Sequence, residues 1–164
     1  MKTLFIIRHA KSSWDIATLN DFDRTLNERG KKDAPIMAQR LLDKKITIDS
    51  FVSSPAKRAK KTAEFFCSAY KKNKEDIIFI SALYHAESKS FFEVVEQLND
   101  DINNVAIFSH NPGITEFANQ LVSNTRIDNI PTCGIFGVQI NIAKWKDFTK
   151  AKKDLLLFDY PKME

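Results

Sequence analysis

Short apolar runs alternate with longer amphipathic stretches along this chain, and this alternation restricts its fold more than any other feature. Strands are predicted at the apolar runs 3–7, 51–53, 77–80, 105–108, 135–140 and 155–158. Apolar residues at helical spacing predict helices at about 27–44, 56–70, 90–98 and 113–122. Each of the first four strands is therefore followed by a helix, which is typical of a parallel α/β sheet with helices on both faces. The last two strands, joined by "NIAKWKDFT", look like a hairpin-type ending that can make the sheet mixed.

Length and composition favour one folded domain. The chain has 164 residues, of which 43% are hydrophobic and 28% charged, as in soluble globular proteins. It contains no internal repeat, low-complexity tract or linker. We expect a single domain over residues 1–164, and a monomer.

The charge and the apolar runs exclude several classes of partner. The net charge of +4 is scattered, and the densest basic cluster, "AKRAKK" at 56–61, is too short to form a nucleic-acid surface. No apolar stretch approaches the length of a membrane span, and the run at 4–7 is too short for a secretory signal. Cys67 and Cys133 lack a metal-binding spacing and are interpreted as packing residues in a reducing compartment. A cytoplasmic protein with no membrane or nucleic-acid partner is expected.

All three histidines follow the ends of predicted strands. His9 comes after Arg8 at the end of the first strand, His85 follows the third, and His110 follows the fourth. Arg58 lies in the first turn of the helix after the second strand. Because ligands of open α/β sheets bind beyond the carboxyl ends of the strands, these side chains are expected to converge there.

This set of residues predicts a phosphoryl ligand. Arginine presents a planar fork of donors to phosphate oxygens, and the free N–H groups of a helix start add anion affinity. A histidine among arginines has a lowered pKa, so that one imidazole stays neutral and nucleophilic near pH 7. A zinc site on the three histidines is disfavoured because two converging arginines would repel a dication.

Four motifs in order carry a family resemblance: "LFIIRHAKSSW", "LNERGKKDA", "SSPAKRAKKTA" and "FSHNPG". They resemble the motif set of the histidine phosphatase, or phosphoglycerate mutase-like, superfamily, and the layout is closest to its small bacterial phosphohistidine phosphatases. The resemblance implies a three-layer α/β/α sandwich that uses no metal and no organic cofactor. It further implies that His9 is the nucleophile and that Arg8, Arg58 and His110 hold the transferring phosphoryl group.

The segment after the third strand departs from the family pattern. Many members that cleave phosphate esters carry a glutamate there as general acid, whereas this chain places His85 at that position and Glu87 two residues later. An imidazole leaves a phosphoramidate with less acid assistance than an alkoxide needs, which favours P–N over P–O substrates. Ser12, in the loop after the first strand, and Asn111 are further candidates for substrate contacts. Arg24 is expected to pair with Asp21 or Asp23.

The favoured function is hydrolysis of phosphohistidine on a protein. Two alternatives remain open. One is a phosphatase of small phosphate monoesters that uses His85 or Glu87 as general acid. The other is a non-catalytic domain that binds a phosphorylated ligand; a mutase is disfavoured because it needs a second site to retain and reorient its substrate.

Overall fold

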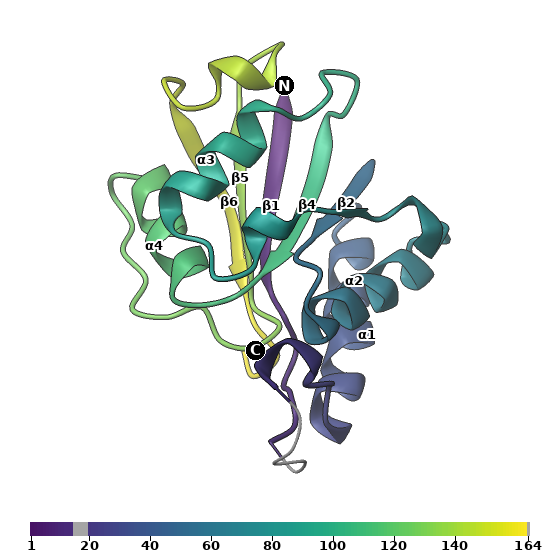
Figure 1. Ribbon diagram of the computed structural model, residues 1–164. Coiled ribbons are helices and arrows are strands. Elements are labelled where there is room, and N and C mark those ends of the chain that lie inside the picture. Colours follow the sequence, from purple (N-terminus) through teal and green to yellow (C-terminus); the bar gives the residue numbers. More distant parts are fainter. Residues whose placement is uncertain (15–19, 164) are drawn as a thin grey trace.

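The computed structural model describes residues 1–14 and 20–163, and within them a six-stranded sheet lies between helices (Figure 1). The strands are β1 (Lys2–Arg8), β2 (Ser50–Ser53), β3 (Ile78–Phe79), β4 (Asn104–Ser109), β5 (Ile135–Ile140) and β6 (Lys153–Asp159). The α-helices are α1 (Glu28–Asp43), α2 (Lys57–Ala69), α3 (Ser88–Glu96) and α4 (Gly113–Leu121). Short 3₁₀ helices are η1 (Asp21–Asp23), η2 (Lys74–Asp76), η3 (Ser81–Leu83) and η4 (Trp145–Asp147).

The sheet is mixed, as the sequence indicated. Its strand order is β3-β2-β4-β1-β5-β6, in which β3, β2, β4 and β1 run parallel. β5 pairs with β1 and with β6 in antiparallel orientation, so the last two strands form the expected ending. β3 has only two residues and lies at the sheet edge, where it pairs with β2 alone.

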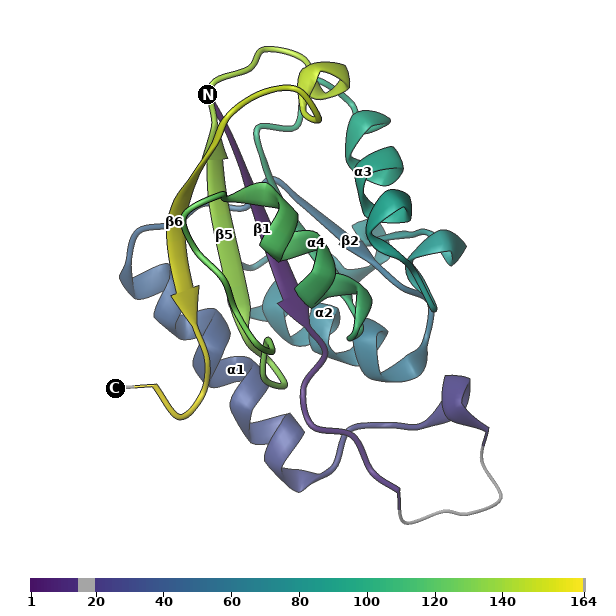
Figure 2. The ribbon, with the colours of Figure 1, turned by 90° about the vertical axis from the view of Figure 1, so that its left-hand side faces the viewer.

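The helices lie in two layers, with α1 and α2 on one face of the sheet and α3 and α4 on the other (Figure 2). A hydrophobic core lies between the sheet and each layer. The alternation of side chains along β1 shows this directly, because Leu4 and Ile6 join the core beneath α3 and α4, while Phe5 and Ile7 join the core beneath α1 and α2. All four side chains are at most 1% exposed. The α/β/α sandwich implied by the resemblance is therefore confirmed.

The two cysteines and the lengths of the helices also agree with the expectations from the sequence. Cys67 and Cys133 are both buried and unpaired, as expected for packing residues, and burial raises the pKa of Cys67 to about 11. Across the described ranges, no helix is long and apolar enough to cross a membrane.

The register of β1 and β4 sets the position of the site. Arg8 pairs with Ser109 in the parallel ladder, so the residues that follow the two strands, His9 and His110, emerge side by side. β2 lies on the other side of β4, with Ser53 opposite Phe108. The next residue, Ser54, therefore reaches the same edge of the sheet.

Candidate active site

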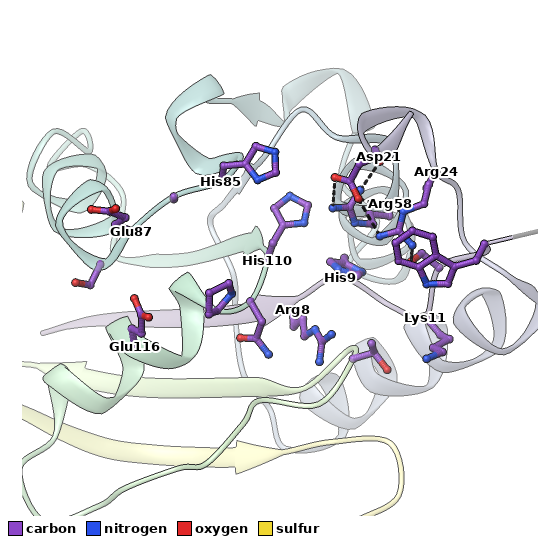
Figure 3. A pocket seen from close by; sticks show the side chains of 17 residues that line it. Arg8, His9, Lys11, Asp21, Arg24, Arg58, His85, Glu87, His110 and Glu116 are labelled. Atoms are coloured by element: carbon purple, nitrogen blue, oxygen red, sulfur yellow. Dashed lines mark hydrogen bonds and ion pairs between the residues drawn. The ribbon is translucent and has the colours of Figure 1, made fainter. Parts of the chain in front are cut away.

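A cavity of about 640 Å³ opens at the carboxyl ends of the parallel strands (Figure 3). Its walls come from the loop after β1, the start of α2, the loop before α3 and the start of α4. The structure brings together every site residue that the sequence suggested. The cavity is lined by Arg8, His9, Ser12, Arg58, His85, Glu87, His110 and Asn111.

His9 is buried at the end of the central strand, with its side chain only 6% exposed. Its Nδ1 lies 2.8 Å from the carbonyl oxygen of Ala10. A carbonyl oxygen only accepts, so Nδ1 carries the hydrogen and Nε2 keeps its lone pair. Burial, opposed by this hydrogen bond and reinforced by the charges of Arg58 and Arg8, lowers the His9 pKa to about 3. His9 is therefore a neutral imidazole with a free nitrogen at neutral pH.

His110 lies beside His9, with 5.2 Å between the ring centroids. Its Nε2 is 2.8 Å from the hydroxyl oxygen of Ser54, which already accepts a hydrogen bond from the Ala56 N–H. With the Ser54 hydroxyl as the donor, Nε2 accepts and the hydrogen of His110 is on Nδ1. This Nδ1 is buried and has no partner within the described chain. Burial, with smaller contributions from His9 and from the charge of Arg58, lowers the His110 pKa to about 2.

Arg8 and Arg58 each retain an unused donor. Arg8 Nη1 donates to the Ile130 carbonyl at 3.0 Å, and Arg58 donates through Nη1 to the Asp21 carbonyl at 2.7 Å. The Nε atom of each arginine is buried without a partner among the described residues. Buried donors are normally paired, so two such atoms beside the unpaired His110 Nδ1 indicate a site that binds an oxyanion.

The first turn of α2 is hydrogen-bonded to the loop that follows β1. The Ala10 N–H donates to Thr62 Oγ1 at 2.9 Å, and the same hydroxyl donates to the Arg58 carbonyl at 2.8 Å. α2 begins without a side-chain cap and has no acidic residue in its first turn. Its free N–H groups therefore add positive potential beside His9. No local pattern in the sequence indicated this link through Thr62.

Asp21 connects three elements around Arg58. Its carboxylate accepts hydrogen bonds from Arg58 Nη2 at 2.9 Å, from the Tyr84 hydroxyl at 2.7 Å and from Arg24 Nε at 3.2 Å. Partial burial alone would raise the pKa of Asp21, but these hydrogen bonds and the two arginine charges lower it to about 2. The expected pairing of Arg24 with Asp21 is present, whereas the links to Arg58 and Tyr84 were not foreseen. The one feature of the sequence that could have indicated these links is the acidic character of Asp21, since an arginine of a cationic site needs a carboxylate partner.

Ser12 and Asn111 line the cavity but are engaged with protein partners. The Ser12 hydroxyl accepts from Arg24 Nη1 at 2.9 Å. The Asn111 amide donates to Asn129 Oδ1 at 2.7 Å and to the Ile130 carbonyl at 3.0 Å. The Ile130 carbonyl oxygen therefore accepts hydrogen bonds from both Asn111 and Arg8, and Asn111 helps to hold the acceptor of the arginine in place.

His85 and Glu87 occupy a different wall of the cavity. Both are exposed, and His85 adopts a left-handed backbone conformation with φ of 56°. The His85 ring lies 4.0 Å from that of Tyr84, centroid to centroid. Within the described ranges, no group of three or more His, Cys, Asp or Glu residues is arranged to hold a metal ion.

Comparison with known proteins agrees with the motifs and with this geometry. The model of the histidine phosphatase superfamily (branch 1) matches residues 4–83. The match spans just under half of the chain, and together with the α/β/α fold it confirms the resemblance to this superfamily. Among sequence relatives, the uncharacterized protein ML1117 of Mycobacterium leprae is 26% identical over 168 residues, covering 95% of this chain and 100% of the relative.

Solved structures of this fold include proteins with different substrates. The SixA protein of Agrobacterium tumefaciens has a TM-score of 0.81 and 24% identity, covering 98% of both chains. The protein histidine phosphatase SixA complexed with tungstate has a TM-score of 0.82 and 20% identity, covering 97% of both chains. The mycobacterial glucosyl-3-phosphoglycerate phosphatase Rv2419c, solved with VO₃, has a TM-score of 0.75 and 12% identity, covering 98% of this chain and 100% of that one. At these identities the structures show a common fold.

The neutral histidines make stability depend on pH. In the folded protein His9 and His110 remain unprotonated at pH 5, because their pKa values are about 3 and about 2. In the unfolded chain they bind protons below a pKa of about 6.5, so stability falls as the pH drops through that value. The expected loss between pH 7 and pH 5 is about 2 kcal/mol for each histidine. Urea unfolding of the wild type and of His9→Asn in phosphate-free buffer measures this, and equal pH slopes would contradict it.

Asp21 is predicted to stabilise the buried Arg58. The substitution Asp21→Asn removes the charged partner of a guanidinium that is 5% exposed. It should lower the free energy of unfolding by about 1–2 kcal/mol at pH 7. The matched control is Asp23→Asn, which breaks only an exposed ion pair to Lys57 and should cost less than about 0.5 kcal/mol. Equal effects of the two substitutions would show that Asp21 has no special role.

Proposed function

We propose that this protein is a phosphatase that hydrolyses phosphohistidine on proteins through a covalent intermediate on His9. The match to the histidine phosphatase superfamily supports the general activity. The observation that carries the proposal is the set of unpaired buried donors, Arg8 Nε, Arg58 Nε and His110 Nδ1, around a neutral His9. A related SixA structure holds tungstate, a tetrahedral oxyanion, which is consistent with such a set of donors.

The first step is transfer of the phosphoryl group to His9. The Nε2 lone pair attacks phosphorus in line with the bond to the leaving group, and the electron pair of that bond returns to the leaving nitrogen. Nδ1 keeps its hydrogen on the Ala10 carbonyl, which holds the ring in the attacking orientation. The three donors stabilise the charge on the phosphoryl oxygens as the bond order changes.

Water completes the cycle. It attacks phosphorus, the new O–P bond forms, and the bond from phosphorus to His9 Nε2 breaks. His9 leaves as the neutral imidazole with Nδ1–H retained, and dihydrogen phosphate then loses a proton to solvent at neutral pH. Two arginines and the N-terminus of α2 supply the positive charge that this chemistry needs, so no step requires a metal or an organic cofactor.

A phosphohistidine substrate also fits a site whose candidate proton donors, His85 and Glu87, lie on its exposed wall. A protonated phosphoimidazole leaves as a neutral imidazole and needs no proton from the enzyme at the breaking bond. His85 and Glu87 lie on the cavity wall with exposed side chains, where a protein-borne side chain has access to them. A phosphate ester would instead require one of these two groups to donate a proton.

The decisive experiment is to trap the phosphorylated enzyme. Brief reaction with a phosphohistidine protein at low temperature should yield an acid-labile, base-stable phosphate that maps to His9. His9→Asn should reduce turnover by at least about 10³-fold and abolish the label, because the nucleophile is absent. Label on another residue, or full turnover by His9→Asn, would remove this mechanism; no turnover of any P–N or P–O substrate would favour the phospho-ligand binding domain.

The second candidate function is hydrolysis of small phosphate monoesters. It is favoured by the structural likeness to the glucosyl-3-phosphoglycerate phosphatase and by the position of His85 in the cavity. The two functions separate in one assay of the same preparation on a phosphohistidine protein and on phosphomonoesters. We expect the P–N substrate to be preferred and His85→Ala to retain most of that activity. A preference for esters that is lost in His85→Ala would support the second function instead.

A further inference from the structure

The two sides of the cavity carry opposite charges. Arg58 and Arg24 lie on the side of η1 and α2, whereas Glu87 and Glu116 lie on the side of α3 and α4 (Figure 3). His110, which is 8% exposed and has an unpaired Nδ1, lies between the two sides. In the described chain, neither glutamate side chain has a hydrogen bond or ion pair. The phosphoryl donors and the two carboxylates therefore share one cavity.

Packing between α4 and the segment that leads into α3 places the backbones of Glu87 and Glu116 near each other. Gln120 on α4 donates a hydrogen bond to the Ser88 hydroxyl on α3 at 2.9 Å. Gly113, the first residue of α4, lies so close to the segment before α3 that a Cβ there would overlap the carbonyl oxygen of Ala86. The starts of the two helices therefore form one wall, and each contributes one glutamate to it.

Nearby charges leave this wall acidic. The cation that follows on α3, Lys89, pairs with Glu93 at 3.9 Å. Glu87 is the N-cap residue of α3, and Glu116 lies in the first turn of α4, so each offsets the positive end of its own helix. α2 has no such acidic residue at its start. A substrate anion is therefore attracted to the α2 side, and a cation to the α3–α4 side.

We propose that Glu87 and Glu116 make the enzyme select phosphoryl compounds whose leaving group is cationic and disfavour those that carry a second anion. The inference rests on the phosphatase function proposed above and narrows its substrate class to N-phosphorylated imidazolium groups and similar phosphoramidates. The carboxylates stabilise the protonated phosphoimidazole. When His9 attacks, the P–N electron pair returns to the leaving nitrogen, and the imidazole departs neutral with its proton on the other nitrogen.

The test compares two aryl phosphates of opposite leaving-group charge, 4-(aminomethyl)phenyl phosphate and 4-(carboxymethyl)phenyl phosphate. The readout is the ratio of their kcat/KM values or, if the esters are not cleaved, of their inhibition constants against a phosphohistidine peptide. The wild type should favour the cationic compound by about tenfold at low salt, as expected for unit charges across a partly solvated cavity. The double variant Glu87→Gln/Glu116→Gln should bring the ratio close to one, and 1 M salt should reduce the wild-type ratio.

Glu75→Gln is the control, because it removes an exposed carboxylate that does not line the cavity. It should leave the ratio unchanged, while circular dichroism verifies that all variants are folded. A ratio unaffected by the double substitution, or a wild-type preference for the carboxylate compound, would overturn the inference and leave the phosphatase function intact. Failure to cleave any substrate or to bind either compound would refute both.

Discussion

The parallel pairing of β1 with β4 is the constraint on which the rest of the site depends. Because Arg8 pairs with Ser109, the next residues, His9 and His110, leave the sheet side by side with 5.2 Å between ring centroids. Burial at this edge, reinforced by the charges of the neighbouring arginines, keeps both rings neutral. A shift of one residue in this register would turn one histidine toward the other face of the sheet and separate the pair.

The arginines proposed to bind the phosphoryl group must themselves be held in place, and protein acceptors outside the motifs do this. Arg8 is held by the Ile130 carbonyl, and Arg58 by the backbone and side chain of Asp21. Each contact uses some of the donors and leaves the buried Nε free. Preorganised donors of this kind stabilise a transition state without reorganising as charge moves, which is the largest electrostatic contribution available to phosphoryl transfer.

The charges around the cavity are unevenly distributed, so that its two sides differ in electrostatic potential. Positive potential gathers at the start of α2, and negative potential at the starts of α3 and α4. A single phosphoryl group bonded to a protonated nitrogen satisfies both ends of such a cavity, whereas a metabolite with two anionic groups satisfies only one. Structures of this fold include a protein histidine phosphatase and a glucosyl-3-phosphoglycerate phosphatase, so the fold alone does not set the substrate.

The sequence by itself determined the strands and α-helices, the mixed sheet and the four motif segments, because apolar periodicity and residues at strand ends are local properties of the chain. It also predicted that His9, Arg8, Arg58 and His110 meet at one edge, since parallel strands end together. Only the tertiary structure decided what holds these groups and what state they adopt. Thr62, Ser54 and Asp21 contact the site across loops and sheet edges, and no local pattern encodes a hydrogen bond between segments that far apart in sequence.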